Sequence, residues 1–498
     1  MAKFRKISID KHSPKTYSEQ IFDQFNQAIQ TGTLLLGSKL PSIRDLSAQL
    51  KINKIGIISA YNKLCDAGLI KAKPGSGFYV SFKKNNRNLL TNTKKETTNN
   101  FIFKKHQANY TPPNYLNIPL DFCNLGGNQV YKSFSIMEEL RAISRICFSN
   151  QTLIYDPPCP YGLRNLKEAI AFDLENKGMP ILSSEQIVIC NGALHALNII
   201  LESFLQKNDC IAFEIPNNDI FFYTDILKQY QIITVERTPE KLLLTEEKIT
   251  EIKSKKPKIF IIYSNCHSPT ANSLSSIERH NLIKLAKEIN ALIIEMDIYS
   301  ALNYDDFTLP NLSTIDGLNN TFYVASYSKV LAPGIKVGYI ASNIEYIKQI
   351  KTSKLIQTII PSLIDQQIIY ELIIRGVMKK HITKLKSNFR SKRDTLIAML
   401  KKLSPLGAKW NQPEAGMFLW FEFPSGEDLR IIEQRALEKK ISIAPGYYFS
   451  NEEKHFNHMR INFANLEPLL MYNALETLFT IWRNASSRKW IIKNDRHS

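Results

Sequence analysis

Two segments of the sequence place chemically useful groups at the ends of predicted strands. Lys329 follows the apolar run 321–326, so its primary amine is expected at the carboxyl edge of a sheet, where ligands of α/β proteins bind. Gly192 closes another apolar run and a helical pattern begins at Ala193. The free backbone N–H groups of Ala193 and Leu194 therefore favour a phosphate. Considered alone, this second segment is equally consistent with an ordinary strand-to-helix turn.

The region around these segments alternates short apolar runs with amphipathic helical patterns such as 276–289. This alternation predicts an α/β fold with a mostly parallel sheet covered by helices on both faces. From about Asp365 the pattern changes to one long helix followed by mixed segments, so a second, smaller subdomain is expected. The predicted strands are 186–190, 210–214, 258–263, 292–297 and 321–326.

The first part of the chain has a different pattern. Apolar residues in 17–31 recur at the spacing of one helix face, and Ser42 with Asp45 can form a capping box that opens a second helix. After a break at residues 52–53 a third helix is expected, followed by a hairpin whose turn is the PGSG sequence at 74–77. This order of elements is the layout of a winged helix-turn-helix. Its predicted core residues are Ile21, Phe22, Phe25, Ile29, Ile57, Tyr61 and Leu64.

The positive charge is concentrated in this first part. The chain has a net charge of +18, and residues 1–105 hold 19 Lys and Arg against 6 Asp and Glu. A charge so placed predicts an anionic partner for the N-terminal region. Residues 83–118 are polar, basic and without periodicity, so they are expected to form a linker between domains 1–82 and 119–498.

The cysteines and the apolar runs exclude several other classes of protein. The seven cysteines are scattered without a C-x-x-C pair, which argues against a disulfide framework and against a metal site. Buried free thiols are expected instead. No apolar run reaches the length of a membrane span, and the first residues lack the apolar stretch of a signal peptide. A soluble cytoplasmic protein is expected.

The segment 16–82 resembles the DNA-binding domain of GntR-type repressors, because the helix-turn-helix, the AYNKL helix and the PGSG wing occur in order. The resemblance implies a third helix in the major groove and a wing beside it. It implies phosphate contacts for Ser42 and Arg44. Asn53 and Lys54 stand where the family has Ser and Arg, and lysine lacks the fork that reads guanine well. The other DNA-binding residues implied are Gly75, Ser76 and Gly77.

The large region resembles fold-type I aminotransferases, which bind pyridoxal 5'-phosphate. The sequence ASYSKVLAPGIKVGYI is similar to their S-x-S-K-x-x-x-P-G-x-R-x-G motif. The resemblance makes Lys329 the lysine that bonds to the cofactor, Ser326 a cofactor contact, and Lys336 a point charge in place of the arginine. HMRINFA places Arg460 where the family has the arginine that binds the substrate carboxylate.

A GntR-type winged helix joined to such a domain resembles the MocR subfamily of regulators. The resemblance implies an aminotransferase-like large domain over 119–365 and a small domain with a C-terminal tail over 366–498. It implies a double-stranded DNA operator and an amino-acid or amino-compound effector. It also implies a homodimer, in which the DNA-binding domain of one chain can lie over the large domain of the other.

Departures from the family pattern fall on the chemistry of the cofactor. The family's carboxylate, which pairs with the pyridine nitrogen, is replaced by Met296. Asp297 follows directly, and its side chain is expected on the opposite face of the strand unless a bulge turns it. Ser268 replaces an asparagine that contacts the phenolic oxygen, while Tyr299 remains for that oxygen. Ala271 replaces a glycine.

The ring-stacking aromatic residue is also replaced, here by Asn218, which leaves His195 or Phe222 for that role. Without a protonated pyridine nitrogen the ring is a poor electron sink. The sequence therefore favours a regulator that binds and senses pyridoxal phosphate over an efficient enzyme. Two alternatives remain open, namely an active aminotransferase with an attached DNA-binding domain, and a regulator that has lost the cofactor.

Overall fold

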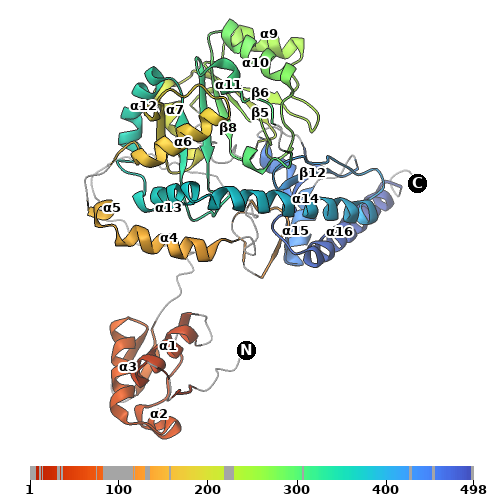
Figure 1. Ribbon diagram of the computed structural model, residues 1–498. Coiled ribbons are helices and arrows are strands. Elements are labelled where there is room, and N and C mark those ends of the chain that lie inside the picture. The colour runs from red at the N-terminus through yellow and green to blue at the C-terminus, as the bar shows by residue number, and fades with distance from the viewer. Residues whose placement is uncertain are drawn as a thin grey trace, which may run out of the picture. The chain divides into compact units, whose positions relative to one another are not determined.

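The computed structural model describes residues 7–10, 13, 15–30, 34, 37–73, 76–81, 116, 118–119, 121–128, 135–155, 159–217, 229–305, 308–424, 429–450 and 455–494. The chain divides into two compact units, Met1–Lys105 and His106–Ser498 (Figure 1).

The N-terminal unit is a winged helix-turn-helix, as predicted. Its core is centred on Tyr61, whose ring meets Phe25 and Phe78 edge to face at centroid distances of 5.8 and 4.9 Å. The Tyr61 hydroxyl donates to the Pro41 carbonyl at 2.8 Å, so its polar end is satisfied inside the core. The elements are α1 (Tyr17–Gln30), α2 (Ile43–Leu50), α3 (Lys54–Asp66), β1 (Ile70–Lys73) and β2 (Gly77–Val80).

The large domain contains a seven-stranded sheet in the order β4-β10-β9-β8-β7-β5-β6. All neighbouring pairs are parallel except those of β10, which runs antiparallel to both β4 and β9. The five predicted strands are present, whereas β6 and β10 were not predicted. The bounds are β4 (Ile187–Cys190), β5 (Cys210–Ile215), β6 (Gln231–Glu236), β7 (Ile259–Ile262), β8 (Leu292–Asp297), β9 (Thr321–Ser326) and β10 (Gly338–Ala341).

Helices cover both faces of this sheet, as the alternating pattern predicted. One face packs on α7 (Ala193–Phe204) and α12 (Ile344–Gln357). The other face packs on α6 (Arg164–Asn176) and α13 (Leu363–Ile374) at one end, and on α9 (Glu246–Lys255) and α10 (Ser276–Glu288) at the other. Alternate residues of β9 divide between the faces, with Val324 in the first core and Tyr323 in the second.

The small domain is built on the antiparallel sheet β11-β12-β15-β14. Figure 1 shows α13 and α14 in line, α4 beneath α13, and α15 and α16 at the far end of α14. The short strand β3 pairs with β13, so the chain just after the linker joins the small domain. The remaining bounds are β3 (Cys123–Asn124), α4 (Met137–Ser149), α5 (Gln151–Tyr155), α11 (Leu312–Asp316), α14 (Val377–Leu403), β11 (Lys409–Trp410), β12 (Phe418–Glu422), α15 (Leu429–Glu438), β13 (Ile441–Ser442), β14 (Ala444–Pro445), β15 (His458–Asn462) and α16 (Pro468–Asn494).

The cysteines and the helices bear on the other sequence predictions. All seven cysteines are free, and four of them are buried, but Cys159 is exposed, so the prediction of buried thiols holds only in part. Within the part of the chain that the structure describes, no helix is long and apolar enough to cross a membrane.

Candidate functional site

The N-terminus of α7 forms an open cradle at the end of β4. Gly192 precedes the helix with φ of 86°, and a Cβ atom there would meet no described atom within 4 Å. No side chain among the described residues caps this helix end, so its first N–H groups, those of Ala193 and Leu194, have no capping side-chain acceptor there. A Cβ atom on Gly338 would lie 2.7 Å from the Gly192 carbonyl carbon, so only glycine lets β10 pack this closely.

Lys329 lies just beyond the end of β9, at the edge of the sheet where Ser326, Gly338 and Cys190 lie side by side on β9, β10 and β4. Its side chain is half-buried, and its Nζ donates to the Asn128 carbonyl at 3.3 Å. Two serines shape the turn that carries it. Ser328 donates to the Ile335 carbonyl at 2.9 Å and Ser326 to the Val337 carbonyl at 3.2 Å. In this structure Ser326 thus binds backbone, and it fixes the turn that positions Lys329.

Arg460 of β15 is fully buried, and its guanidinium joins three parts of the domain. Its Nη2 donates to the Gly126 carbonyl at 2.7 Å and its Nη1 to the Ser268 hydroxyl at 3.5 Å. The guanidinium also lies 4.2 Å from the ring centre of Phe418 and 4.9 Å from that of Phe449. Two aromatic rings and hydrogen bonds therefore hold the fork in one orientation.

Tyr299 shares this aromatic surface with Arg460. Its ring meets Phe418 edge to face at 5.6 Å, and the side chain is almost fully buried. Ser268, Tyr299 and Arg460 are thus gathered around Phe418 and the loop after β7. Ala271 of that loop has φ of 58°, a left-handed conformation that suits the glycine expected from the family pattern.

Met296 and Asp297 lie on opposite faces of β8. Met296 is fully buried in the core that contains Tyr299 and Val330. Asp297 faces the other core, where it accepts from the Tyr323 hydroxyl at 2.7 Å and from the Ser300 N–H at 3.2 Å. β8 keeps its regular pairing with β9 through Asp297, so no bulge turns this carboxylate. The Asp297 carboxylate therefore points away from the residues around Tyr299.

Lys336 and His195, two further residues predicted at the cofactor site, have the following surroundings. The Lys336 side chain is exposed, and its backbone N–H bonds to Asp365. His195 accepts from the Asn191 N–H at 3.0 Å through Nδ1, and its Nε2 lies 3.2 Å from the Thr358 hydroxyl. Both ring nitrogens are therefore engaged between α7 and α12. Asn218, Phe222 and Gly75 lie outside the described residues.

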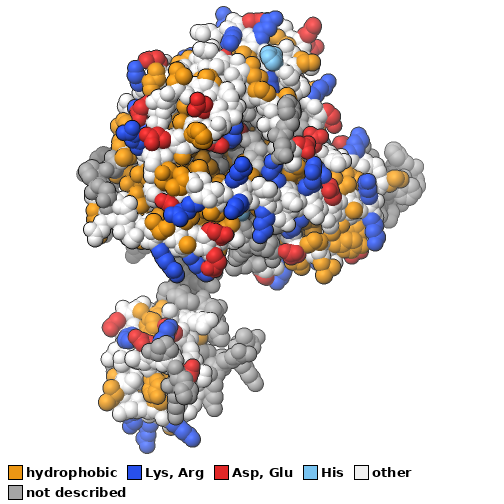
Figure 2. All heavy atoms as spheres, in the orientation of Figure 1, with side chains coloured by type: hydrophobic (Ala, Val, Ile, Leu, Met, Phe, Trp, Pro, Cys, Tyr) orange, Lys and Arg blue, Asp and Glu red, His pale blue; other side chains and the backbone are white. Residues whose placement is uncertain are grey.

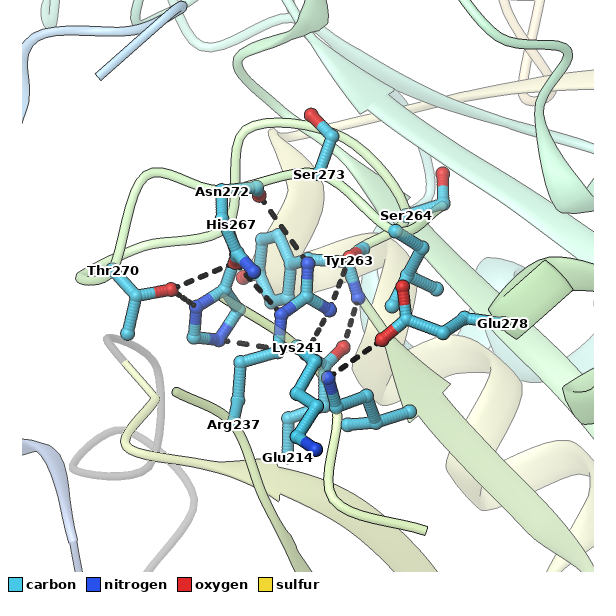
Figure 3. A network of polar contacts seen from close by, with 12 residues as sticks. Glu214, Arg237, Lys241, Tyr263, Ser264, His267, Thr270, Asn272, Ser273 and Glu278 are labelled. Atoms are coloured by element: carbon cyan, nitrogen blue, oxygen red, sulfur yellow. Dashed lines mark hydrogen bonds and ion pairs between the residues drawn. The ribbon is translucent and has the colours of Figure 1, made fainter. Parts of the chain in front are cut away.

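A buried polar network supports the loop that carries Ser268 (Figure 3). Arg237 and Glu214 form a fully buried ion pair at 2.6 Å. Arg237 also donates to the Asn272 side chain at 2.8 Å and to the Tyr263 carbonyl at 3.1 Å. From the small domain, Asn411 donates to the Thr270 carbonyl at 2.6 Å. The buried ion pair of Arg237 and Glu214 thus helps to fix the position of the loop that carries Ser268.

His267 belongs to this network and predicts an acid-sensitive fold. It is fully buried, its Nδ1 lies 2.8 Å from the Thr270 hydroxyl, and burial together with Arg237 holds its pKa well below 6.5. Below that pH the unfolded chain binds a proton that the folded chain does not bind, so stability falls as pH falls. The expected slope is about 1.4 kcal/mol per pH unit for this histidine.

The measurement is urea unfolding of the wild type and of His267→Gln between pH 7 and pH 5. The substitution keeps a polar group beside Thr270 but removes the titration, so its pH dependence should be flatter. Equal slopes for the two proteins would assign the acid sensitivity to other groups.

Some residues of the site were not predicted from the sequence. Asn462 donates to the Gly127 carbonyl at 2.8 Å, next to the Arg460 contact with Gly126. The contributing carbonyls belong to the CNLGG sequence, whose glycine pair was the available signal. A Cβ atom on Gly126 would lie 2.4 Å from the Ala444 backbone nitrogen, so the close approach requires glycine.

The N-terminal unit presents a polar and basic surface around α2 and α3. Ser42 caps α2 through the Asp45 N–H at 3.1 Å, and Asn53 caps α3 through the Ile55 N–H at 3.2 Å. Arg44 and Lys54 are exposed. Figure 2 shows Lys and Arg side chains gathered at the end of this unit where α2 lies in Figure 1.

The wing and α3 complete this surface. The Ser76 hydroxyl lies 2.7 Å from the Tyr79 hydroxyl, and Gly77 has φ of 107°, which favours glycine. On α3 the exposed residues include two isoleucines, Ile55 with 71% and Ile58 with 42% of its surface exposed. An exposed apolar pair on this helix is a feature that the sequence prediction did not include.

Family models match both units. The model of aminotransferase class I and II matches residues 142–478, and the model of bacterial regulatory proteins of the gntR family matches residues 17–80. Similar curated proteins include the HTH-type transcriptional regulator NorG of Staphylococcus aureus, 26% identical over 89% of this chain and 99% of its own length. The HTH-type transcriptional regulator YdfD of Bacillus subtilis is 24% identical over 90% of this chain and 93% of its own.

Solved structures of aminotransferases match about three quarters of the chain. The multiple substrate aminotransferase of Thermococcus profundus has a TM-score of 0.68 and 25% identity, covering 74% of this chain and 93% of its own. The kynurenine aminotransferase of Pyrococcus horikoshii has a TM-score of 0.69 and 24% identity, covering 73% and 91%. The chain therefore belongs to the class I and II aminotransferase family and, with its gntR-type N-terminal domain, is a transcription regulator of the MocR type.

Proposed function

We propose that this regulator responds to pyridoxal 5'-phosphate, or to its adduct with an amino compound, bound between the cradle at Gly192 and Arg460. The observation that carries the proposal is the arrangement of three groups at one end of the sheet. The N-terminus of α7 has no side-chain cap among the described residues, Lys329 follows β9 at the same edge of the sheet, and Arg460 is fixed between aromatic rings. These residues fit a phosphate, an aldehyde and a carboxylate, respectively.

Each residue has a separate part in this proposal. The N–H groups of Ala193 and Leu194 would hold the phosphate, and Tyr299 would donate to the phenolic oxygen. Bound there, the cofactor supplies an aldehyde that condenses with a primary amine, releasing water, and Lys329 provides that amine. Arg460 would hold the carboxylate of an amino acid, while Ser268 beside it would orient the guanidinium.

The surroundings of β8 favour sensing over turnover. Met296 occupies the position of the family's carboxylate, and Asp297 is bonded to Tyr323 on the opposite face. With an apolar side chain there, the pyridine nitrogen would stay unprotonated and stabilise developing negative charge poorly. The intact Lys329 and Arg460 keep an aminotransferase as the second candidate, which release of a keto acid from an amino-acid donor would reveal.

The test is the visible absorption spectrum of the protein with pyridoxal phosphate, before and after borohydride reduction, followed by peptide mass mapping. We expect a reduced adduct on Lys329 in the wild type and none in Lys329→Ala. Lys348→Ala is a matched control, because Lys348 is exposed on α12 and pairs with Glu345 one turn away on the same helix. An adduct that survives in Lys329→Ala would place the site elsewhere, and no adduct in the wild type would exclude the cofactor.

DNA is the partner that the gntR-type domain implies, and we propose that a homodimer binds two half-sites of an operator. Ser42, Arg44 and Lys54 would contact phosphates or bases from α2 and α3, with Gly75, Ser76 and Gly77 in the wing. Phosphate contacts release counterions, so affinity should fall steeply with salt.

The exposed Ile55 and Ile58 predict a preference for thymine in the major groove, where an apolar side chain contacts the C5-methyl group. In a duplex selected for tight binding, replacing each contacted thymine by deoxyuracil should raise Kd roughly fourfold, because about 0.8 kcal/mol of methyl burial is lost. The same replacement should cost Ile58→Ala less than it costs the wild type. Equal losses in the two proteins would show that Ile58 does not touch a thymine methyl group.

A further inference from the structure

Three successive backbone carbonyls are held by side chains of the proposed ligand site. The Gly126 carbonyl accepts from Arg460 at 2.7 Å, the Gly127 carbonyl from Asn462 at 2.8 Å, and the Asn128 carbonyl from Lys329 at 3.3 Å. Two of these three donors are the cations that the proposed function assigns to a carboxylate and to an aldehyde. Segment 126–128 therefore accepts hydrogen bonds from Arg460 and Lys329, the two groups proposed to bind the ligand.

The same stretch of chain follows directly on the linker to the DNA-binding domain. Leu116 and Ile118 pack against Trp420, Ala444 and Phe449 of the small domain. Farther along, β3 pairs with β13, and the Leu125 N–H donates to the Ser442 carbonyl at 2.9 Å. Segment 116–128 thus connects the end of the linker to Lys329 and Arg460 without an intervening domain.

Phe449 belongs to both parts of this connection. It belongs to the cluster with Trp420 and Ala444 against which Leu116 and Ile118 pack, and the Arg460 guanidinium lies 4.9 Å from its ring. A change in how Arg460 is bonded therefore acts directly on the surface that holds the start of the segment.

We infer that segment 116–128 carries the ligand signal to the DNA-binding domain, because ligand and backbone compete for the same two cations. The inference rests on the proposed function of the site. A carboxylate accepts a hydrogen bond from a guanidinium more strongly than a neutral carbonyl does, so it displaces Gly126 from Arg460. Condensation of the Lys329 amine with the cofactor's aldehyde would release water and remove at least two of the three ammonium protons, so the hydrogen bond to Asn128 would be lost. Asn462 is then the remaining anchor of the three.

Competition of this kind is reciprocal. If ligand loosens segment 116–128, a DNA complex that requires the anchored segment weakens ligand binding by the same factor. Removing the anchors by substitution should then imitate the ligand. Arg460→Met and Lys329→Met in ligand-free protein should each shift the affinity for DNA in the direction that the ligand shifts it.

The test is hydrogen exchange of the full-length protein, read on peptides that cover 116–128, together with DNA affinity. The probes are pyridoxal phosphate, whose aldehyde engages Lys329, and N-(5'-phosphopyridoxyl)-L-leucine, which has no aldehyde to bond Lys329 but carries a carboxylate for Arg460. We expect exchange in this segment to rise at least about tenfold in Arg460→Met, the scale of a lost charge-assisted hydrogen bond, and to rise more with the leucine adduct than with pyridoxal phosphate.

Arg393→Met is the matched control for Arg460→Met, since Arg393 is also buried and also donates to a backbone carbonyl, that of Pro413, at 2.7 Å. In Arg393→Met, hydrogen exchange of the peptides that cover 116–128 should equal that of the wild type. A probe that binds without changing exchange or DNA affinity would overturn the inference and leave the proposed function standing. If no probe binds, the proposed function fails, and wild-type exchange in both ligand-free variants would then overturn the inference as well.

Discussion

Met296→Asp is expected to convert a binding site into a catalyst of transamination. The substitution places a carboxylate on the face of β8 that packs in the same core as Tyr299, where Met296 is now fully buried. A carboxylate at that position stabilises a protonated pyridine nitrogen, and with it the charge that develops when the amino acid loses its α-proton. The rate of the half-reaction with an amino-acid donor should rise by roughly a hundredfold, measured as cofactor absorbance in single turnover.

Met296→Asn is the control, because it has nearly the shape of aspartate without its charge. It should bind the cofactor no more tightly than Met296→Asp does. It should also show no gain in the rate of the half-reaction. Asp297→Asn tests the other carboxylate. Asp297 accepts from Tyr323 at 2.7 Å on the opposite face, so its loss should lower stability and leave the cofactor spectrum unchanged. A spectrum that changes in Asp297→Asn, with no gain in Met296→Asp, would show that Asp297 serves the cofactor.

The architecture could be predicted from the sequence because its signals are local. Continuous apolar runs gave β4, β5, β7, β8 and β9, and helix periodicity and turn residues gave the winged helix. β6 was missed because QIITVE alternates exposure, with Gln231 exposed and Ile233 buried, as an edge strand does. β10 was missed because it begins with glycine, which weakens the pattern of a strand.

The opposite faces of Met296 and Asp297 could also be predicted, since side chains alternate along a strand. The hydrogen-bond partners of Lys329 and Arg460 could not be predicted. Their acceptors are backbone carbonyls 201 and 334 residues away in the sequence, and every residue type has such a carbonyl. The same limit applies to Glu214 and Arg237, whose pairing depends on which strands become neighbours in the sheet.

Arg237→Met should be among the most destabilising substitutions in the large domain. It leaves the Glu214 carboxylate buried without its ion pair, and it deprives the Tyr263 and Asn272 carbonyls of a donor. Breaking a buried ion pair from one side costs about 3–5 kcal/mol of the free energy of unfolding. Denaturant unfolding followed by circular dichroism measures this loss. Arg164→Met, which removes an exposed partner of Glu168, should show no measurable change.

The double variant Arg237→Met with Glu214→Gln separates the buried charge from the lost packing. Glutamine is neutral and keeps an oxygen that can accept from the Tyr263 N–H, as Glu214 does at 2.5 Å. Much of the lost stability should therefore return, because the larger part of the cost is an uncompensated charge. If the double variant were as unstable as Arg237→Met, the important loss would be the hydrogen bonds to the loop itself. Ser268 would then lose its position beside Arg460. The main role of the network would be to hold the loop of the proposed ligand site, and the stability gained from the ion pair would be the smaller part.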